Sequence, residues 1–414
     1  METWLEIYIR GVIKFEKIDE RLIPEINIGT LGHVDHGKSS IVEALTGKWP
    51  AIHSEELKRG ITIKLGYADA AIYKCEKCDC YWMNETCPKC SGKCEPVRTV
   101  SFVDAPGHET LMATVLTGAN LMDGILFVIA ANEKCPQAQT KEHLMVLEIV
   151  GIKNIVIVQS KIDIVTKERA LEHFNEIKEF VKGTIAENAP IIPVSARQEV
   201  NLDFLLKALE ENIQTPERNL DKPPKMLVVR SFDVNKPGTD IEKLRGGVLG
   251  GGLVQGKLKL DDEIEIRPGI FLNNKWLALK TKVVGLQKAG KNLEEAGTGG
   301  LLGVMTELDN SLTKSDSLSG SVAGRELPSV LNKLSVKVNL FEKVIEEKIE
   351  PIRMGEQLLM NAGVTRTIGT VKKMKNQVYD FDLRLPVCAD KGDRVVLSRR
   401  IEERWRLIGW GFVE

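Results

Sequence analysis

The stretch GHVDHGKS, residues 32–39, has two glycines followed by a lysine and a serine. This spacing is typical of a phosphate-binding loop, in which main-chain N–H groups surround the phosphate oxygens. Lys38 would add positive charge, and the hydroxyl of Ser39 would ligate magnesium. A candidate strand, INIGTLG, precedes the loop, and a candidate helix, SSIVEALTG, follows it, as the pattern requires. The stretch therefore predicts a nucleoside triphosphate site, with a simple glycine-rich turn as the alternative.

A second group of candidate residues, DAPGH at 104–108, comes at the end of the candidate strand TVSFVDA. A carboxylate at Asp104 can hold magnesium through a water molecule, and the N–H of Gly107 can contact a terminal phosphate. His108 then lies where it can orient an attacking water, although most histidines are ordinary polar residues. Together the two loops predict hydrolysis of a terminal phosphate.

Three weaker motifs have a similar arrangement. Thr62, in RGITIKLGYAD, has a hydroxyl that can complete a magnesium shell, or it is simply a β-branched strand residue. Asp163, in SKID at 160–163, can accept both N–H bonds of a guanine edge, and VSAR at 194–197 follows the next candidate strand. Five loops in this order, each beside a strand end, predict one guanine nucleotide site.

These loops need a scaffold, and the chain from Asn27 to about Thr215 predicts one. Short runs rich in Val and Ile alternate with longer helix-like segments, a pattern that favours a parallel, doubly wound sheet. Ligands bind at the carboxyl ends of the strands in such sheets. We therefore predict a doubly wound α/β P-loop domain at residues 25–215, and we assign no function to an N-terminal extension at residues 1–24.

The remaining chain has a different pattern. The run QTPERNLDKPPK, residues 214–225, concentrates proline and charge, and helical periodicity almost vanishes beyond it. Short alternating strands recur between glycine-rich stretches such as RGGVLGGGLVQG, which we interpret as turns. A turn-like GRELPS near Arg325 marks a second boundary. We predict two β-barrel domains, at residues 216–325 and 326–414.

Composition restricts the class of protein. The 414 residues carry a formal net charge of -1, with 43% hydrophobic and 28% charged residues. No segment approaches the length of apolar sequence that a membrane span needs. The first residues have acidic groups inside their apolar run and lack a small-residue cleavage site. We expect a cytoplasmic protein with no membrane span, and not a wholly basic nucleic-acid binder.

Six of the eight cysteines lie in the stretch from residue 74 to residue 94, which we predict to be a zinc ribbon. Two pairs have the x2 spacing of ribbon-type zinc sites, and four sulfur ligands favour zinc over magnesium. The predicted ligands are Cys75, Cys78, Cys87 and Cys90. A disulfide or an iron–sulfur cluster is the alternative, and Cys80 or Cys94 can substitute as a ligand. The flanking strands are long enough to hold the cluster roughly 20 Å from the phosphates, so we predict a structural role.

The loops GHVDHGK, RGITI and DAPGH together resemble the motifs of the translational GTPases. Within them the chain is most similar to the gamma subunits of the archaeal and eukaryotic translation initiation factor two. The stretches that carry this resemblance span roughly residues 25–414: HSEELKRGITIKLGYAD, the cysteine insert before VSFVDAPGHE, RSFDVNKPGT, RGGVLGGG and SRRIEERWRLIGWGFV.

The resemblance implies a GTPase that, with Mg2+ and Zn2+, delivers initiator methionyl-tRNA to the small ribosomal subunit. It implies that the second domain binds the alpha subunit of the same factor, that the GTP-binding domain binds the beta subunit, and that the barrels help to hold tRNA. Tyr67 would meet the aminoacylated end of the tRNA, or it is a core aromatic residue of a strand.

By position in the shared motifs, the resemblance also implies roles for individual residues. Val34 and Ile61 would form an apolar gate between the catalytic His108 and the water. Ser39 and Thr62 would ligate magnesium, with Asp104 acting through water. A second cation would bind at Asp35 and the Gly60 carbonyl. The implied GTP contacts are Asp35, His36, Gly37, Lys38, Ser39, Ser40, Gly107, Ser160, Lys161, Ile162, Asp163, Ser195, Ala196 and Arg197.

One residue departs from the family pattern, because Ser160 stands where the guanine motif normally begins with Asn. A hydroxyl is shorter and offers fewer hydrogen bonds than an amide, so base contact or loop bracing would be weaker. We expect guanine selectivity to survive through Asp163.

Two other functions fit the sequence. One is a nucleotide-gated RNA-binding scaffold with negligible hydrolysis of its own. The other is a different tRNA carrier, such as the selenocysteine-specific factor, which an additional C-terminal domain would favour.

Overall fold

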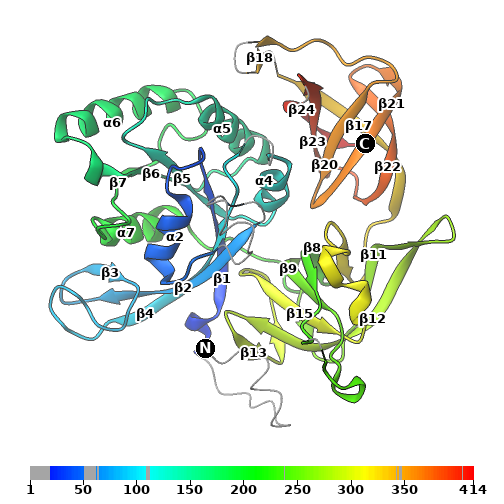
Figure 1. Cartoon of the computed structure of the whole chain (residues 1–414), viewed down its shortest axis with the longest axis horizontal. Helices are drawn as coiled ribbons and strands as arrows, with labels where there is room; N and C mark the ends of the chain where they lie inside the picture. The colour runs from blue at the N-terminus through cyan, green and yellow to red at the C-terminus, as the bar shows by residue number, and fades with distance from the viewer. Residues whose placement is uncertain are drawn as a thin grey trace.

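The computed structural model describes residues 19–50, 62, 65–108, 112–236, 238–341, 343–344, 347–402 and 404–414. Figure 1 shows an α/β domain on the left and two β-domains on the right, one above the other. Most of the predicted N-terminal extension, residues 1–18, lies outside the described residues.

The α/β domain is built on a seven-stranded sheet of order β3-β2-β4-β1-β5-β6-β7. Its strands are β1 (Pro24–Leu31), β2 (Gly66–Cys75), β3 (Cys80–Trp82), β4 (Glu95–Asp104), β5 (Gly124–Ala130), β6 (Ile155–Ser160) and β7 (Ile191–Pro193). The five strands from β4 to β7 along this order are parallel, as predicted. β2 is antiparallel to both β3 and β4, which agrees with the prediction that two flanking strands hold the cysteine insert away from the phosphates. The chain returns from β2 to β4 through the cysteine hairpin, and a hairpin joins antiparallel strands.

Helices cover both faces of this sheet. They are α2 (Lys38–Thr46), α4 (Met112–Ala119), α5 (Ala138–Val150), α6 (Lys167–Val181) and α7 (Leu202–Asn212). The helices α4, α5 and α6 contribute side chains to one core, and α2 and α7 contribute to the other. The central strand β5, GILFVIA, is buried at every position because it faces both cores. The prediction of a doubly wound α/β domain is confirmed.

The first β-domain, which we call barrel II, contains β8 to β16. Its strands are β8 (Lys225–Phe232), β9 (Val248–Gln255), β10 (Leu258–Lys259), β11 (Glu263–Leu272), β12 (Lys275–Lys288), β13 (Lys291–Leu293), β14 (Glu295–Ala296), β15 (Leu302–Thr306) and β16 (Val322–Gly324). The main sheet has the order β11-β16-β8-β9-β15-β12-β13, and pairing of β11 with β12 closes it into a barrel.

The glycine-rich stretch RGGVLGGGLVQG forms a central strand of barrel II, so its interpretation as a turn is wrong. β9 within it pairs with both β8 and β15. A side chain at Gly251 would collide with the main-chain carbonyl of Leu227. The glycines therefore allow neighbouring strands to approach closely where the sheet curls.

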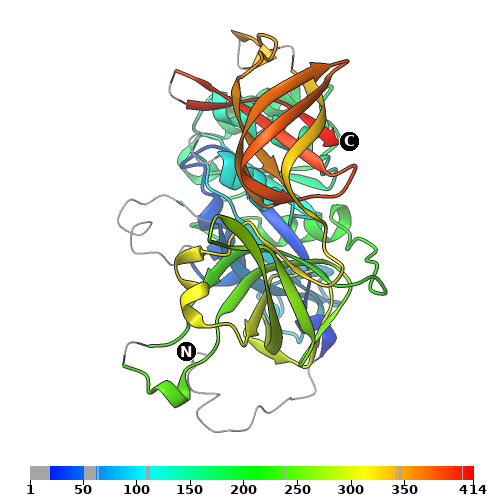
Figure 2. The same cartoon turned by 90° about the vertical axis from the view of Figure 1, so that its right-hand side faces the viewer.

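The second β-domain, barrel III, contains β17 to β24. Its strands are β17 (Val330–Leu340), β18 (Lys343–Val344), β19 (Glu347–Lys348), β20 (Gln357–Ala362), β21 (Thr365–Lys375), β22 (Val378–Cys388), β23 (Arg394–Ile401) and β24 (Arg404–Val413). Six of them form the closed barrel β17-β22-β21-β20-β23-β24. The two barrels face the viewer in Figure 2, and each has its own apolar core. The predicted architecture of one α/β domain and two barrels is confirmed.

Barrel III packs on the helices α4 and α5 of the α/β domain (Figure 1). Arg406 donates a 2.7 Å hydrogen bond to Glu142 on α5. Asn361 donates to the carbonyl of Ala113 on α4 at 3.1 Å, and Asn120 donates to the carbonyl of Gly363 at 2.8 Å. The barrel therefore contacts the two helices that follow the DAPGH loop and β5.

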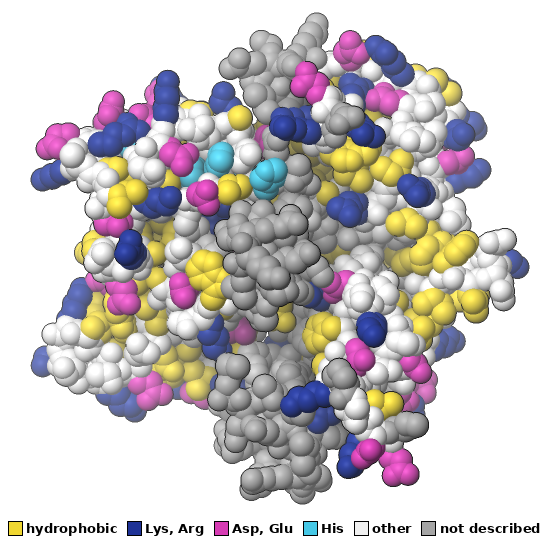
Figure 3. Space-filling view, in the orientation of Figure 1, with side chains coloured by type: hydrophobic (Ala, Val, Ile, Leu, Met, Phe, Trp, Pro, Cys, Tyr) yellow, Lys and Arg dark blue, Asp and Glu magenta, His cyan; other side chains and the backbone are white. Residues whose placement is uncertain are grey.

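Side chains of both charges are interspersed over the face seen in Figure 3, as the near-neutral net charge would suggest. Within the described part of the chain, the helices are too short or too polar to cross a membrane.

Candidate nucleotide site and cysteine cluster

The predicted motifs meet at one edge of the α/β sheet. The phosphate loop joins β1 to α2, and the other loops follow β4, β6 and β7, which run parallel to β1. Asp35 and Gly37 have positive φ angles of 59° and 86°, so the loop curls as a phosphate loop must. Two predicted residues, Gly60 and Ile61, lie outside the described residues.

Hydroxyl and carboxylate oxygens converge at the start of α2. Ser39 Oγ donates to Asp104 Oδ2 at 2.6 Å, and Thr62 Oγ1 donates to the same oxygen at 3.2 Å. Thr30 Oγ1 donates to Asp104 Oδ1 at 2.7 Å. Burial raises the pKa of Asp104 above its ordinary value, and the hydrogen bonds from Ser39 and Thr30 offset only part of this rise. A group of hard oxygen donors around a buried carboxylate fits magnesium, which would favour the charged carboxylate.

Lys38 is buried inside the loop. Its amine donates to the carbonyls of Gly32 at 2.9 Å and His33 at 2.7 Å. Burial lowers the pKa of Lys38 to about 8, against the attraction of Asp104 and Asp35. A phosphate oxygen would be a better partner for this amine than a neutral carbonyl, because a bond between opposite charges is stronger.

Gly107 lies against the phosphate loop. A Cβ at this position would collide with the amine of Lys38 and would lie 2.8 Å from the main-chain nitrogen of Val34. Only glycine leaves room for this approach. Gly107 therefore lies beside the phosphate loop and beside Val34. His108, the next residue, is half-buried.

The loops on the guanine side are also joined to the phosphate loop. Ser160 Oγ donates a 2.6 Å hydrogen bond to the carbonyl of His36. Lys161 has a positive φ of 58°, and Asp163 follows with an exposed carboxylate. Ser195 is fully buried, and its hydroxyl accepts from the N–H of Gln198 at 3.2 Å. The remaining predicted residues on these loops are exposed or half-buried: Ser40, Ile162, Ala196 and Arg197.

The ring of His36 points away from solvent. Its Nδ1 lies 3.2 Å from the Val128 carbonyl and its Nε2 lies 3.3 Å from Glu133. Burial lowers the pKa of His36 to about 4, so the ring is neutral at pH 7. The side chain of His36 thus fastens the loop to β5, and its main chain accepts the bond from Ser160.

Sequence reasoning missed two polar residues of this site, Thr30 and Glu133. Thr30 could have been found from register, because it lies on β1 opposite Asp104 on β4. Nothing in the sequence around Glu133 distinguishes it from other surface carboxylates.

The four cysteines with x2 spacing form a compact group. The sulfur atoms of Cys75, Cys78, Cys87 and Cys90 all lie within 4.8 Å of one another. None of the cysteines, all of which are described, forms a disulfide. Burial raises the pKa of the Cys87 thiol, but main-chain N–H groups of Cys90 and Lys89 and the neighbouring thiols together lower it to about 6. The hydrogen bond with Cys90 raises the pKa of Cys78, so the charge in this group is concentrated on Cys87. A thiol held near its thiolate form is suited to metal binding.

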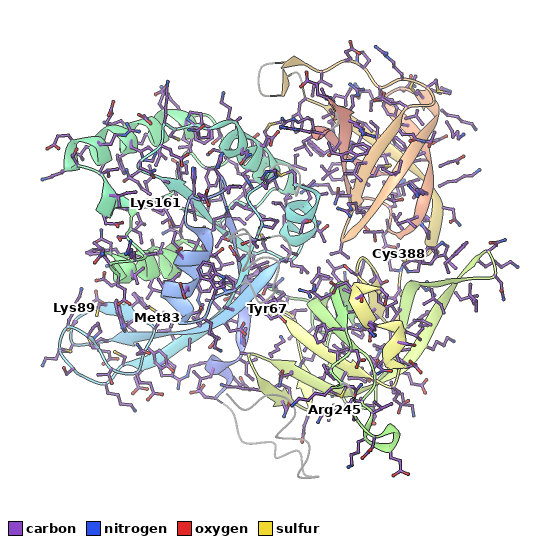
Figure 4. All side chains as sticks on the ribbon, in the orientation of Figure 1. Tyr67, Met83, Lys89, Lys161, Arg245 and Cys388 are labelled. Atoms are coloured by element: carbon purple, nitrogen blue, oxygen red, sulfur yellow. The ribbon has the colours of Figure 1, made fainter. Side chains whose placement is uncertain are left out.

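The other two cysteines of the insert lie beside this group. Cys80 Sγ is 3.7 Å from Cys87 Sγ, and Cys94 is fully buried. The cluster is anchored to α7, since Lys89 donates a 2.5 Å hydrogen bond to Asp203 and lies over the ring of Phe204. Figure 4 shows Lys89 on the cysteine hairpin, at the opposite side of the domain from the barrels.

Relatives over the whole chain decide the family. Translation initiation factor 2 subunit gamma of Methanothermobacter thermautotrophicus is 56% identical over 403 residues, which cover 94% of this chain and 99% of that protein. The chain belongs to the gamma subunits of translation initiation factor 2. The subunit of Archaeoglobus fulgidus is 55% identical over 97% of both chains, and that of Methanocaldococcus jannaschii is 56% identical over 94% of this chain and 97% of its own.

Two family profiles match different parts of this gamma subunit. "Elongation factor Tu GTP binding domain" matches residues 24–215, and "Initiation factor eIF2 gamma, C terminal" matches residues 332–413. The chain is therefore a translation initiation factor subunit and a GTPase. GTPase activity implies that the substrate is GTP and that magnesium accompanies it. The predictions of family, function and activity are confirmed.

Solved structures support the fold of this gamma subunit. A bacterial selenocysteine-specific elongation factor superposes with a TM-score of 0.73 at 24% identity, covering 94% of this chain and 58% of that one. The elongation factor SelB of Methanococcus maripaludis, bound to a GTP analogue, gives a TM-score of 0.70 at 23% identity, covering 95% of this chain and 79% of that one. At these identities the likeness extends to the fold alone.

Proposed function

We propose that this gamma subunit binds GTP and magnesium at the edge of its α/β sheet, and that it carries initiator methionyl-tRNA to the small ribosomal subunit in the cytoplasm. It would do so in a complex with alpha and beta subunits. The observation that carries the proposal is the convergence of the phosphate, DAPGH and guanine-side loops in a chain 56% identical to a gamma subunit over nearly all of its length.

The phosphates would be bound by the loop from Asp35 to Ser40. The amine of Lys38 would exchange the carbonyls of Gly32 and His33 for phosphate oxygens, and the N–H of Gly107 would contact the terminal phosphate. Magnesium would be held by the side chains of Ser39 and Thr62, with Asp104 acting through water. A bound magnesium ion would neutralise charge on the phosphates during transfer. A second cation would be held by Asp35 and Gly60.

Hydrolysis requires a positioned water and an in-line approach to the terminal phosphate. His108 would orient this water by hydrogen bonding. Val34 and Ile61 would screen His108 until the complex reaches the ribosome. The close approach of Gly107 to the main-chain nitrogen of Val34 supports a coupling between the gate and the DAPGH loop.

The guanine base would be read by Asp163, whose carboxylate can accept two N–H bonds, with Lys161, Ile162 and Arg197 beside the base. Ser195 and Ala196 would line the other side. Ser160 would brace the phosphate loop through its bond to His36. Selectivity for guanine would then depend on Asp163.

The cysteine cluster would bind one zinc ion through Cys75, Cys78, Cys87 and Cys90. Four sulfur ligands within 4.8 Å of one another match the closed, all-sulfur type of structural zinc site. Zinc there would hold the hairpin in shape against α7. The anchor from Lys89 to Asp203 supports a structural role.

The aminoacylated end of the tRNA would enter a cavity between the α/β domain and barrel II. This cavity has a volume of about 120 Å³ and is lined by apolar residues including Leu65, Phe232 and Leu301, with Tyr67 at its edge. Figure 4 shows Tyr67 where β2 faces barrel II. A methionine side chain is unbranched and adapts to apolar cavities of irregular shape, which supports this assignment.

Barrel II would bind the alpha subunit. An open groove of about 940 Å³ on this barrel is lined by Val234, Asn235 and Lys236, by most residues from Gly238 to Gly246, and by the end of β15. It carries charges of both signs, including Lys236, Asp240 and Arg245. A groove that is open to solvent and carries charges of both signs supports a protein contact. The beta subunit would bind the α/β domain.

The first test is hydrolysis of GTP by the full chain with its alpha and beta subunits, in the presence and absence of small ribosomal subunits. We expect His108→Ala to bind GTP within about twofold of wild type and to lose most of the ribosome-dependent rate, roughly 100-fold or more. An unchanged rate in this variant would overturn the role of His108, and failure of the wild-type chain to bind GTP would overturn the proposed site.

A further inference from the structure

His143, on α5, is a fully buried histidine near the phosphate loop. Its exposure is 0%, and neither ring nitrogen has a hydrogen-bond partner. Burial lowers the pKa of His143 to about 3, so the ring is neutral and carries one N–H donor. A buried donor and acceptor without partners is costly, and a native protein rarely keeps such a group without a reason.

The neighbours of His143 belong to the nucleotide site. Besides burial, its pKa is affected by the charge of Lys38 and by the main chain of Gly107, which acts in the direction expected of a carbonyl oxygen facing the ring. Gly107 in turn lies against Lys38 and the phosphate loop. The ring therefore lies beside the carbonyl of the glycine whose N–H is proposed to contact the terminal phosphate, without a hydrogen bond of normal geometry to it.

The same face of α5 holds further polar atoms without partners. Gln139 and Thr140 precede His143 by four and three residues, so their side chains lie on the same side of the helix. Gln139 Oε1 and Thr140 Oγ1 are buried and have no hydrogen-bond partner. Three residues with unpartnered polar atoms therefore lie along one face of α5.

The residue next to His143 is bonded to barrel III. Glu142 is 4% exposed, and its Oε1 accepts a 2.7 Å hydrogen bond from Arg406 on β24. Adjacent residues on a helix point in directions about 100° apart. One turn of α5 thus contacts the barrel through Glu142 and faces the phosphate site through His143.

We propose that His143 is a positioning residue for Gly107, and that the Glu142–Arg406 contact couples it to barrel III. When the triphosphate is bound, the His143 N–H donates to the Gly107 carbonyl and fixes the two peptides that meet at this glycine. The N–H of Gly107 is then held toward the terminal phosphate. The contact with barrel III holds α5 in the position that this hydrogen bond requires. The inference rests on the proposed GTP site.

The test compares affinities of the full chain for GDP and for a non-hydrolysable GTP analogue. We expect His143→Leu to weaken binding of the analogue about tenfold, which is the effect of one net hydrogen bond, and to leave GDP binding within about twofold. GDP is spared because it has no phosphate at Gly107. His143→Gln retains an N–H donor and should recover most of the loss. A merely structural role would change both affinities equally.

The coupling to barrel III is tested with Glu142→Gln and Arg406→Met. Each should reduce the ratio of the affinity for the GTP analogue to the affinity for GDP, as His143→Leu does. Combining Arg406→Met with His143→Leu should reduce this affinity ratio little further, because both substitutions act on one contact. The matched control is His173→Gln on α6, another fully buried histidine with an unpartnered Nε2, which should leave the ratio unchanged.

An affinity ratio within twofold of wild type in His143→Leu would overturn the positioning role. If that ratio falls while Glu142→Gln and Arg406→Met leave it unchanged, the coupling to barrel III is wrong. A wild-type chain that binds neither nucleotide would instead overturn the proposed GTP site itself, so the two failures are distinguishable.

Discussion

The hydroxyl of Ser160 donates a 2.6 Å hydrogen bond to the main-chain carbonyl of His36. Both residues are buried, and the bond joins the end of β6 to the phosphate loop. The family pattern has Asn, with its longer amide side chain, at the first position of the guanine motif. The serine at this position still makes a contact that braces the phosphate loop. The two halves of the nucleotide site are held together by this short side chain.

Removal of this hydroxyl should weaken both guanine nucleotides together. Ser160→Ala leaves the His36 carbonyl without a partner in a buried position, so we expect the affinities for GTP and GDP to fall about tenfold each. The preference for GTP over ATP should remain, since Asp163 is unchanged. Titration with fluorescent nucleotides measures all three affinities. Comparable ATP and GTP affinities in wild type would refute the role of Asp163, and unchanged GTP binding in Ser160→Ala would refute the bracing.

The cysteine cluster provides a matched pair of substitutions. Cys75→Ser removes one of the four proposed ligands, whereas Cys80→Ser removes a neighbouring thiol outside that group. We expect Cys75→Ser to lose bound zinc and to lower the melting temperature of the α/β domain by roughly 5 °C, which corresponds to about 2 kcal/mol in a domain of this size. Its GTP affinity should hold, because the cluster lies at the opposite end of β2 and β4 from Asp104. Atomic emission and thermal unfolding measure the two effects.

Cys80→Ser is the control and should keep a full complement of zinc. Loss of zinc from both variants would mean that Cys80 takes part in binding. Loss of GTP binding in a folded Cys75→Ser variant would contradict a purely structural cluster.

Lys288 predicts a pH dependence of stability. Lys288 is 3% exposed, and its amine donates to the carbonyls of Gly297 at 2.7 Å and of Gly299. Burial lowers the pKa of Lys288 from 10.5 to about 8, so between these values the unfolded chain binds more protons than the folded one. Stability contributed by this group therefore rises with pH through the window and is lost as pH falls toward 8.

Urea unfolding of wild type and Lys288→Met across this window measures the effect. The free energy of unfolding of wild type relative to the variant should increase by about 2–3 kcal/mol between pH 8 and pH 10.5. Lys280→Met is the control, because Lys280 lies exposed on the same strand, β12. A difference between wild type and Lys288→Met that does not change with pH would show that Lys288 is charged in both states.

The convergence of the candidate site residues was predictable because each of their motifs is local in sequence. The spacing in GHVDHGKS dictates a loop, and Asp104, His108 and Asp163 each follow a strand whose apolar run is easily recognised. Parallel strands then bring these residues to one edge. Thr30 was missed because its role depends on the register of β1 with β4, which no single stretch of sequence encodes.

Other features depend on contacts between distant residues. β9 was misread because its glycines are typical of turns, and only the curl of the barrel makes them suitable for a strand. The helix α7 was not anticipated, although Leu202, Leu205 and Leu209 recur at helical spacing and are fully buried. The pairing of Glu142 with Arg406 spans 264 residues, so neither side chain indicates its partner.

GTP is proposed to make this gamma subunit a selective carrier of initiator methionyl-tRNA. Filter binding measures this with initiator and elongator methionyl-tRNA, each under a GTP analogue and under GDP with the alpha subunit present. We expect strong retention only for the initiator tRNA with the GTP analogue. Equal retention in all four cases would show that the subunit is not a GTP-dependent, selective carrier.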